Sequence, residues 1–86
     1  MASYRLLIQR SAAKELEALP SKDRSRIVAK IEGLGDKPHP PGSEKLSGEE
    51  KYRLRQGDYR VLYSIQDAST TVTVVKIGHR REVYRR

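Results

Sequence analysis

The chain has 86 residues and no cysteine, so we expect one domain spanning residues 1–86 and no disulfide framework. Its 18 Lys and Arg against 11 Asp and Glu give a formal net charge of +7, all of it carried by residues 51–60 and 76–86, and this charge fits a polyanionic partner and a solvated basic surface equally well. No apolar run approaches the roughly 20 residues of a membrane span, and we expect a cytoplasmic protein that makes no membrane contact.

The N-terminal half of the chain predicts a strand, two helices and a loop. Residues 4–8 (YRLLI) are a strand candidate, and Ser11 is a plausible N-cap for a first helix that Pro20 interrupts. A second helix is expected over residues 22–34, and the proline-containing segment 35–48 is expected to be a loop. Apolar residues recur at helical spacing in both helices: Ala12, Leu16 and Leu19 in the first, Ile27, Val28, Ile31 and Leu34 in the second.

Residues 51–65 predict a β-hairpin with Gly57-Asp58 as a type II′ turn. A two-residue turn places Arg55 opposite Arg60 and sends alternate side chains to opposite faces. One face is apolar, with Tyr52, Leu54, Val61, Tyr63 and Ile65, and the other carries Arg53, Arg55 and Arg60. Like charges opposite each other destabilise a sheet, so a bound phosphate is the simplest explanation for this arrangement.

A third strand is predicted over residues 71–78, antiparallel to the second strand of the hairpin. Regular alternation puts Val72 and Val74 on the apolar face and Thr73, Val75 and Ile77 on the arginine side. It also places Ile77 opposite Arg60, and Gly78 ends the strand. The tail then brings Arg80 and Tyr84 to the same basic patch, and His79 can join it. The predicted class is α+β, a small antiparallel sheet packed by two N-terminal helices.

Several kinds of site are not expected from the residues present. The only histidines are His39 and His79, and carboxylates cannot be placed beside them, so we expect no metal. No phosphate-binding glycine loop and no Ser-His-Asp order appears, and we expect no cofactor.

Two segments, YRLRQGDYRVLYSI at residues 52–65 and IGHRREVYRR at residues 77–86, together with the order of the predicted elements, resemble toxins of the RelE/ParE superfamily. The resemblance is specifically to the RelE-type ribosome-dependent mRNA interferases. It covers nearly the whole chain and implies a basic face that enters the ribosomal A site and cuts mRNA there. The implied partners are a cognate antitoxin protein, the ribosome and mRNA.

The resemblance implies roles for Arg53, Arg55, Arg60, Arg80 and Tyr84, and it places His79 where a lysine can occur in the family. Lys51 and Arg81 are added from the same two basic segments. The catalytic residues are Arg60, Arg80, Tyr84 and Arg55, and the RNA-binding residues are Arg53, Lys51, His79 and Arg81. In the implied reaction, an mRNA 2′-hydroxyl attacks its adjacent phosphate, which leaves a 2′,3′-cyclic phosphate and a 5′-hydroxyl. Arg60 holds the scissile phosphate and Arg80 assists the departing 5′-oxygen.

The general base of this reaction is left open. Arg53 and Arg55 stand where the family has lysines, and a guanidinium stays protonated near neutral pH. Tyr84 is then the favoured base, since neighbouring guanidinium groups favour a phenolate. Alternatively, positioning and charge stabilisation dominate and the ribosome completes the site.

Two other functions remain open at this stage. One is a ParE-like toxin that inhibits DNA gyrase by binding, without RNA cleavage. The other is a non-enzymatic RNA or ribosome binder, which is favoured if the missing lysines are indispensable.

Overall fold

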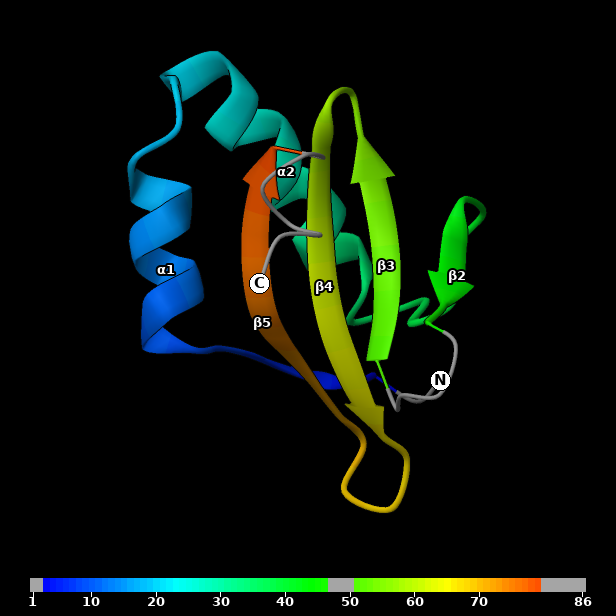
Figure 1. The fold of residues 1–86 in the computed structure, drawn as a ribbon. Helices are drawn as coiled ribbons and strands as arrows, with labels where there is room; N and C mark the ends of the chain where they lie inside the picture. Colours follow the sequence, from blue (N-terminus) through cyan, green and yellow to red (C-terminus); the bar gives the residue numbers. More distant parts are fainter. Residues whose placement is uncertain (1–2, 47–50, 80–86) are drawn as a thin grey trace.

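Five strands form one sheet in the order β1-β5-β4-β3-β2 (Figure 1). The computed structural model describes residues 3–46 and 51–79. The elements in chain order are β1 (Arg5–Ile8), α1 (Arg10–Glu17), α2 (Ser21–Gly33), β2 (Ser43–Lys45), β3 (Lys51–Gln56), β4 (Tyr59–Gln66) and β5 (Thr71–His79). The predicted α+β class is confirmed, although β1 pairs with β5 in parallel while the other neighbours are antiparallel.

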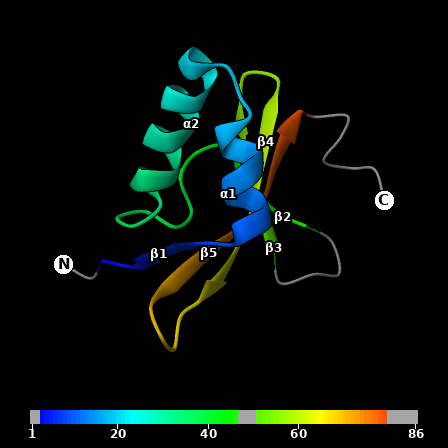
Figure 2. The same cartoon turned by 90° about the vertical axis from the view of Figure 1, so that its left-hand side faces the viewer.

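The two helices lie at different places relative to the sheet. Helix α2 lies behind the sheet in Figure 1, and α1 lies along the side of β5, as the turned view in Figure 2 also shows. The core between them and the sheet consists of Ala12, Ile27, Ile31, Leu34, Leu54, Val61, Tyr63, Val72, Val74 and Ile77. Within the described residues, the face of the sheet toward the viewer in Figure 1 carries no helix.

The predicted hairpin register is confirmed. Arg55 lies opposite Arg60, and Leu54 lies opposite Val61 with both side chains buried. Gly57 has a φ of +60°, while Asp58 is not among the residues with positive φ, as the predicted type II′ turn requires. The arginines of β3 and β4 therefore lie on the face opposite to α2.

The predicted register of β5 is wrong beyond Val74. Gln66 faces Thr71 as expected, but a bulge shifts the register between Leu62 and Tyr63, so that Val75 is the extra residue. Ile77 therefore pairs with Val61 and is buried at 1% exposure, instead of lying opposite Arg60 on the arginine side. Gly78 occupies the position opposite Arg60, and the strand continues to His79 instead of ending at Gly78.

Two predictions for the N-terminal half are also corrected. Helix α1 begins at Arg10 with Gln9 as its N-cap, so Ser11 lies inside the helix. The segment predicted as a loop contains the short strand β2, which pairs with β3. The buried Tyr63 hydroxyl anchors this segment by donating a hydrogen bond to the Pro38 carbonyl at 2.9 Å, and burial raises the pKa of Tyr63. No helix in the described ranges is long and apolar enough to cross a membrane.

Candidate functional site

Arg60 is the centre of the candidate site. It follows the hairpin turn directly, and its side chain folds back over that turn, where Nη1 donates to the carbonyls of Tyr59 at 3.1 Å and Gly57 at 3.5 Å. The residue is only 6% exposed, and its Nε has no hydrogen-bond partner in the described part of the chain. A buried unpaired donor is costly, especially on a charged group, so an anion that reached Nε of Arg60 would gain a strong hydrogen bond.

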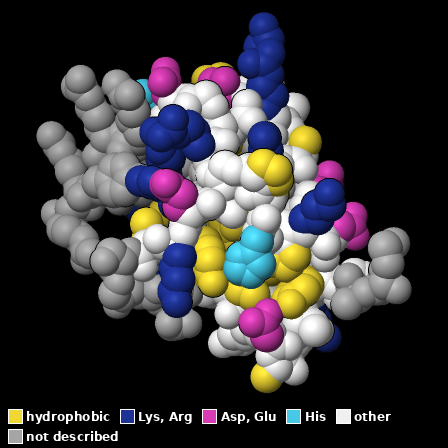
Figure 3. Space-filling model, turned by 90° about the vertical axis from the view of Figure 1, so that its right-hand side faces the viewer, with side chains coloured by type: hydrophobic (Ala, Val, Ile, Leu, Met, Phe, Trp, Pro, Cys, Tyr) yellow, Lys and Arg dark blue, Asp and Glu magenta, His cyan; other side chains and the backbone are white. Residues whose placement is uncertain are grey.

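The other predicted cations of this face differ in their surroundings. Arg55 lies opposite Arg60 and is exposed to solvent. Arg53 forms an ion pair with Glu44, which lies opposite it on β2. Lys51 is half-buried at the start of β3. We call Lys51, Arg53, Arg55 and Arg60 the arginine face. Figure 3 views the molecule from the right-hand side of Figure 1, where separate Lys and Arg side chains, with acidic side chains among them, surround a histidine and an apolar patch.

Of the predicted site residues near the C-terminus, the structure describes only His79. It lies opposite Tyr59, and the two rings make an edge contact with centroids 6.0 Å apart. Tyr59 packs against the core, and its hydroxyl donates to Asp23 of α2 at 3.3 Å. His79 therefore lies on the helix side of the sheet, which corrects its predicted place beside Arg60. The predicted site residues Arg80, Arg81 and Tyr84 lie outside the described residues.

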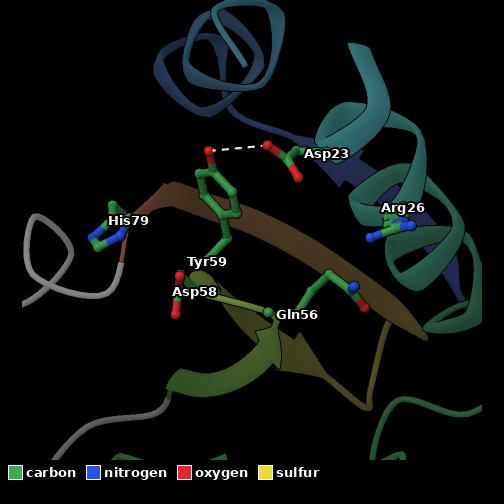
Figure 4. Close-up of a pocket in the computed structure, with 7 residues that line it drawn as sticks. Asp23, Arg26, Gln56, Asp58, Tyr59 and His79 are labelled. Atoms are coloured by element: carbon green, nitrogen blue, oxygen red, sulfur yellow. Dashed lines mark hydrogen bonds between the residues drawn. The ribbon is translucent and has the colours of Figure 1, made fainter. Parts of the chain in front are cut away.

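A concave region lies near the hairpin turn on the helix side, away from the arginine face (Figure 4). It encloses about 420 Å³ and is lined by Asp23, Arg26, Gln56, Gly57, Asp58, Tyr59 and His79. Its lining is polar and carries two carboxylates, so it does not match the phosphate chemistry of the arginine face. No local pattern predicted this pocket, because its residues come from α2, the turn and the end of β5. No group of three His, Cys, Asp or Glu in residues 3–46 and 51–79 is placed to hold a metal ion.

The arginine face combines a buried guanidinium with an exposed one on adjacent strands. Such a pair can hold a phosphate by several charge-assisted hydrogen bonds and can stabilise additional negative charge on it. A guanidinium does not serve as a proton acceptor near neutral pH. The arginines of this face are therefore suited to binding an anion and to stabilising its charge.

Comparisons with known proteins identify the family. A family model described as the ParE toxin of the type II toxin–antitoxin system, parDE, matches residues 6–84. Toxin RelG of Mycobacterium tuberculosis is 32% identical over an alignment 87 residues long. The alignment covers 96% of this chain and 98% of the relative. Toxin RelE of the same organism is 34% identical over 84 residues, with coverages of 95% and 87%.

Solved structures give the same result. A chain of the archaeal RelE–RelB complex from Pyrococcus horikoshii superposes with a TM-score of 0.82 at 31% identity, and the match covers 91% of this chain and 96% of that one. The family match and the relatives each extend over most of the chain, so the chain belongs to the RelE/ParE superfamily of toxins from type II toxin–antitoxin systems.

Proposed function

We propose that this toxin is a ribosome-dependent endoribonuclease that cleaves mRNA in the ribosomal A site. The mRNA 2′-hydroxyl attacks the adjacent phosphate and expels the 5′-oxygen of the next nucleotide, which leaves a 2′,3′-cyclic phosphate. The observation that carries this proposal is the unpartnered Nε of the buried Arg60, next to the exposed Arg55 on the helix-free face. The similarity to Toxin RelE also supports it.

In this proposal Arg60 binds the scissile phosphate. A phosphate oxygen would provide the partner that Nε lacks, and the second oxygen can accept from an adjacent N–H of the same guanidinium. Since Arg60 is only 6% exposed, the interaction takes place where solvent screens it weakly. The hydrogen bonds to the Tyr59 and Gly57 carbonyls hold the group in place before the substrate arrives.

The remaining cations of the arginine face contribute to RNA binding to different extents in the proposal. Arg55 meets the phosphate first, because it is exposed, and it adds positive charge beside Arg60. Arg53 contacts RNA more weakly, since Glu44 already neutralises part of its charge. Lys51 lies further along the same face and contacts the RNA backbone.

The C-terminal residues complete the proposed reaction. Arg80 stabilises the negative charge on the departing 5′-oxygen, which takes a proton from water to become the 5′-hydroxyl, and Arg81 contacts RNA. Tyr84 removes the proton from the 2′-hydroxyl in this proposal, because guanidinium groups favour a phenolate and the arginines of the face stay protonated near neutral pH. The proposal gives His79 at most an indirect role in RNA binding, since it packs against Tyr59 on the helix side.

The proposed partners are the ribosome with its mRNA and a cognate antitoxin protein. The similarity to a RelE that was solved in a RelE–RelB complex supports the antitoxin. An antitoxin with acidic residues would match the net charge of +7.

A second candidate function is inhibition of DNA gyrase by binding, without RNA cleavage. The matching family model is the ParE toxin family, which favours this candidate. Gyrase binding requires no phosphate at Arg60, so the unpartnered Nε favours the nuclease.

The test is to incubate the purified protein with ribosomes that carry a defined mRNA and to map the new 5′ ends. Variants Arg60→Ala and Arg80→Ala should each slow cleavage by roughly 10² to 10³-fold, the typical loss when a transition-state donor is removed. Tyr84→Phe should slow it by roughly 10² to 10⁴-fold, the typical contribution of a general base. Arg10→Ala, which removes an exposed charge on α1, is the control and should cleave normally. Full cleavage by all three variants would refute the site. Gyrase inhibition by a wild-type protein that leaves mRNA intact would establish the second candidate.

A further inference from the structure

The outer edge of β5 has two different neighbours along its length. Strand β1 pairs with it only from Thr71 to Val74, and the Gln9 amide donates the last backbone hydrogen bond to the Val74 carbonyl at 2.9 Å. From Lys76 to His79 no described strand lies on this side. Helix α1 lies along this part of β5 instead (Figures 1 and 2). The backbone groups of an uncovered strand edge need another partner.

Glu15 of α1 provides this partner. Its Oε1 accepts a hydrogen bond from the Ile77 backbone amide at 2.8 Å, and its Oε2 accepts one from Lys76 Nζ at 2.9 Å. One carboxylate thus binds two consecutive residues of β5, immediately after the bulge at Val75. Beyond the bulge β5 pairs with β4 as far as His79, and a bulge disrupts the ladder locally, so this double contact is a second support for the strand end next to the pairing with β4.

The contact lies one residue from the candidate site. Ile77 precedes Gly78, and Gly78 lies opposite Arg60. The same strand end leads to Arg80, which the proposed mechanism places at the departing oxygen. Glu15 also holds the ammonium of Lys76 against α1. The carboxylate is therefore linked to the proposed reaction through the position of the end of β5 opposite Arg60.

We propose that Glu15 is a positioning residue for RNA cleavage, which fixes the end of β5 relative to Arg60. It contacts no RNA. This inference rests on the proposed nuclease function, because a gyrase-binding toxin has no reacting phosphate to align. A misplacement of about 1 Å at a reacting group can slow catalysis by about 10²-fold, so a single backbone contact is enough to matter.

The test compares Glu15→Gln, Glu15→Ala and the control Glu17→Ala, which changes an exposed glutamate on the same helix. A glutamine keeps an oxygen that can accept from the Ile77 amide but loses the ion pair with Lys76. An alanine loses both contacts. Two quantities are measured on each variant: the single-turnover cleavage rate over a range of protein concentrations, and amide hydrogen exchange at Ile77. Circular dichroism checks that each variant is folded.

We expect Glu15→Ala to slow cleavage at saturating protein by about 10-fold or more, while the half-saturating concentration changes by less than about threefold. Amide exchange at Ile77 should rise by about 10-fold in this variant. Glu15→Gln should restore most of the rate and the protection, and Glu17→Ala should match the wild type.

Three results would overturn the inference. The first is a normal rate in Glu15→Ala despite faster exchange at Ile77, and the second is a slower rate without faster exchange. The third is a loss confined to the half-saturating concentration, which would make Glu15 a residue for RNA binding. If Glu15→Ala does not fold, the cleavage rate of Glu15→Gln decides the question. This variant keeps the contact with the Ile77 amide, so a loss of rate as large as that of an Arg60 variant would show that the ion pair with Lys76, and not the backbone contact, matters. A wild-type protein that does not cleave mRNA would refute the proposed function itself. Failure of the proposed function is thereby distinguished from failure of the role of Glu15.

Discussion

Replacing Ile77 with alanine should destabilise the protein several times more than replacing Val75 with alanine. The bulge in β5 turns Ile77 into the core, where it is 1% exposed and lies opposite Val61. Val75, the extra residue of the bulge, is only half-buried. The comparison therefore tests the register that places Gly78, and not Ile77, opposite Arg60.

The expected free-energy changes follow from the burial of each side chain. Removing three buried carbons from Ile77 costs about 2.5 kcal/mol in transfer free energy, and the residual cavity brings the total to about 3–4 kcal/mol. Val75→Ala should cost about 1 kcal/mol or less, because its side chain already contacts solvent. A chain of this length has a free energy of unfolding of about 4–13 kcal/mol, so the Ile77 change removes a large share.

The measurement is urea unfolding followed by circular dichroism, with the midpoint and the slope fitted for each variant. Ile77→Val is a graded control and should cost about 0.5–1.5 kcal/mol. If Val75→Ala proves as destabilising as Ile77→Ala, the bulge is absent and strict alternation along β5 holds. The apolar surface of the arginine side would then include Ile77, and the position opposite Arg60 would have to be reassigned.

Three further predictions concern the hairpin and its surroundings. Arg55→Lys should keep most of the cleavage because it keeps the charge, whereas Arg55→Ala should weaken ribosome binding and flatten its salt dependence, as a salt titration of binding measures. Gly57→Ala should lower the free energy of unfolding by about 1 kcal/mol in thermal melts, because its φ of +60° disfavours a side chain. Burial raises the pKa of Tyr63, so the folded state keeps a proton that the unfolded state loses above about pH 10. The free energy of unfolding should therefore decrease as the pH rises above about 10, and this decrease should be smaller in Tyr63→Phe. Urea unfolding at several pH values measures both.

The hairpin could be predicted because its determinants are local. Gly57 and Asp58 fix the turn, the turn fixes the register, and the period of two then assigns Arg53, Arg55 and Arg60 to one face. The burial of Arg60 was not predictable in this way, since it depends on how the side chain folds back over the turn.

The sequence does contain a pattern that indicates the bulge in β5. Val74 and Val75 are adjacent β-branched residues, which break the alternation, and the apolar positions resume at Ile77. A run that keeps Val72, Val74 and Ile77 on one face requires an extra residue between them. The prediction of strict alternation ignored this doublet.

Other features carry no local signal. Strand β2 is three polar residues long and lacks any periodic apolar pattern, so only its pairing with β3 makes it a strand. The pocket at Asp23 and the contact of Glu15 with Ile77 join residues far apart in the chain. Such contacts follow from the tertiary arrangement and not from spacing in the sequence.

The parallel pairing of β1 with β5 has a consequence for the order in which parts of the protein form and open. The strands β3, β4 and β5 follow one another and can pair through short connections, whereas the pairing of Arg5 with Thr71 closes almost the whole described chain into a loop. Closing a longer loop costs more entropy and slows folding, so β1 should dock last and detach first. Helix α1 follows β1 directly, and its Glu15 holds the end of β5. Early opening of the N-terminal segment would therefore remove the Glu15 contact from the end of β5 while the hairpin of β3 and β4 remained paired.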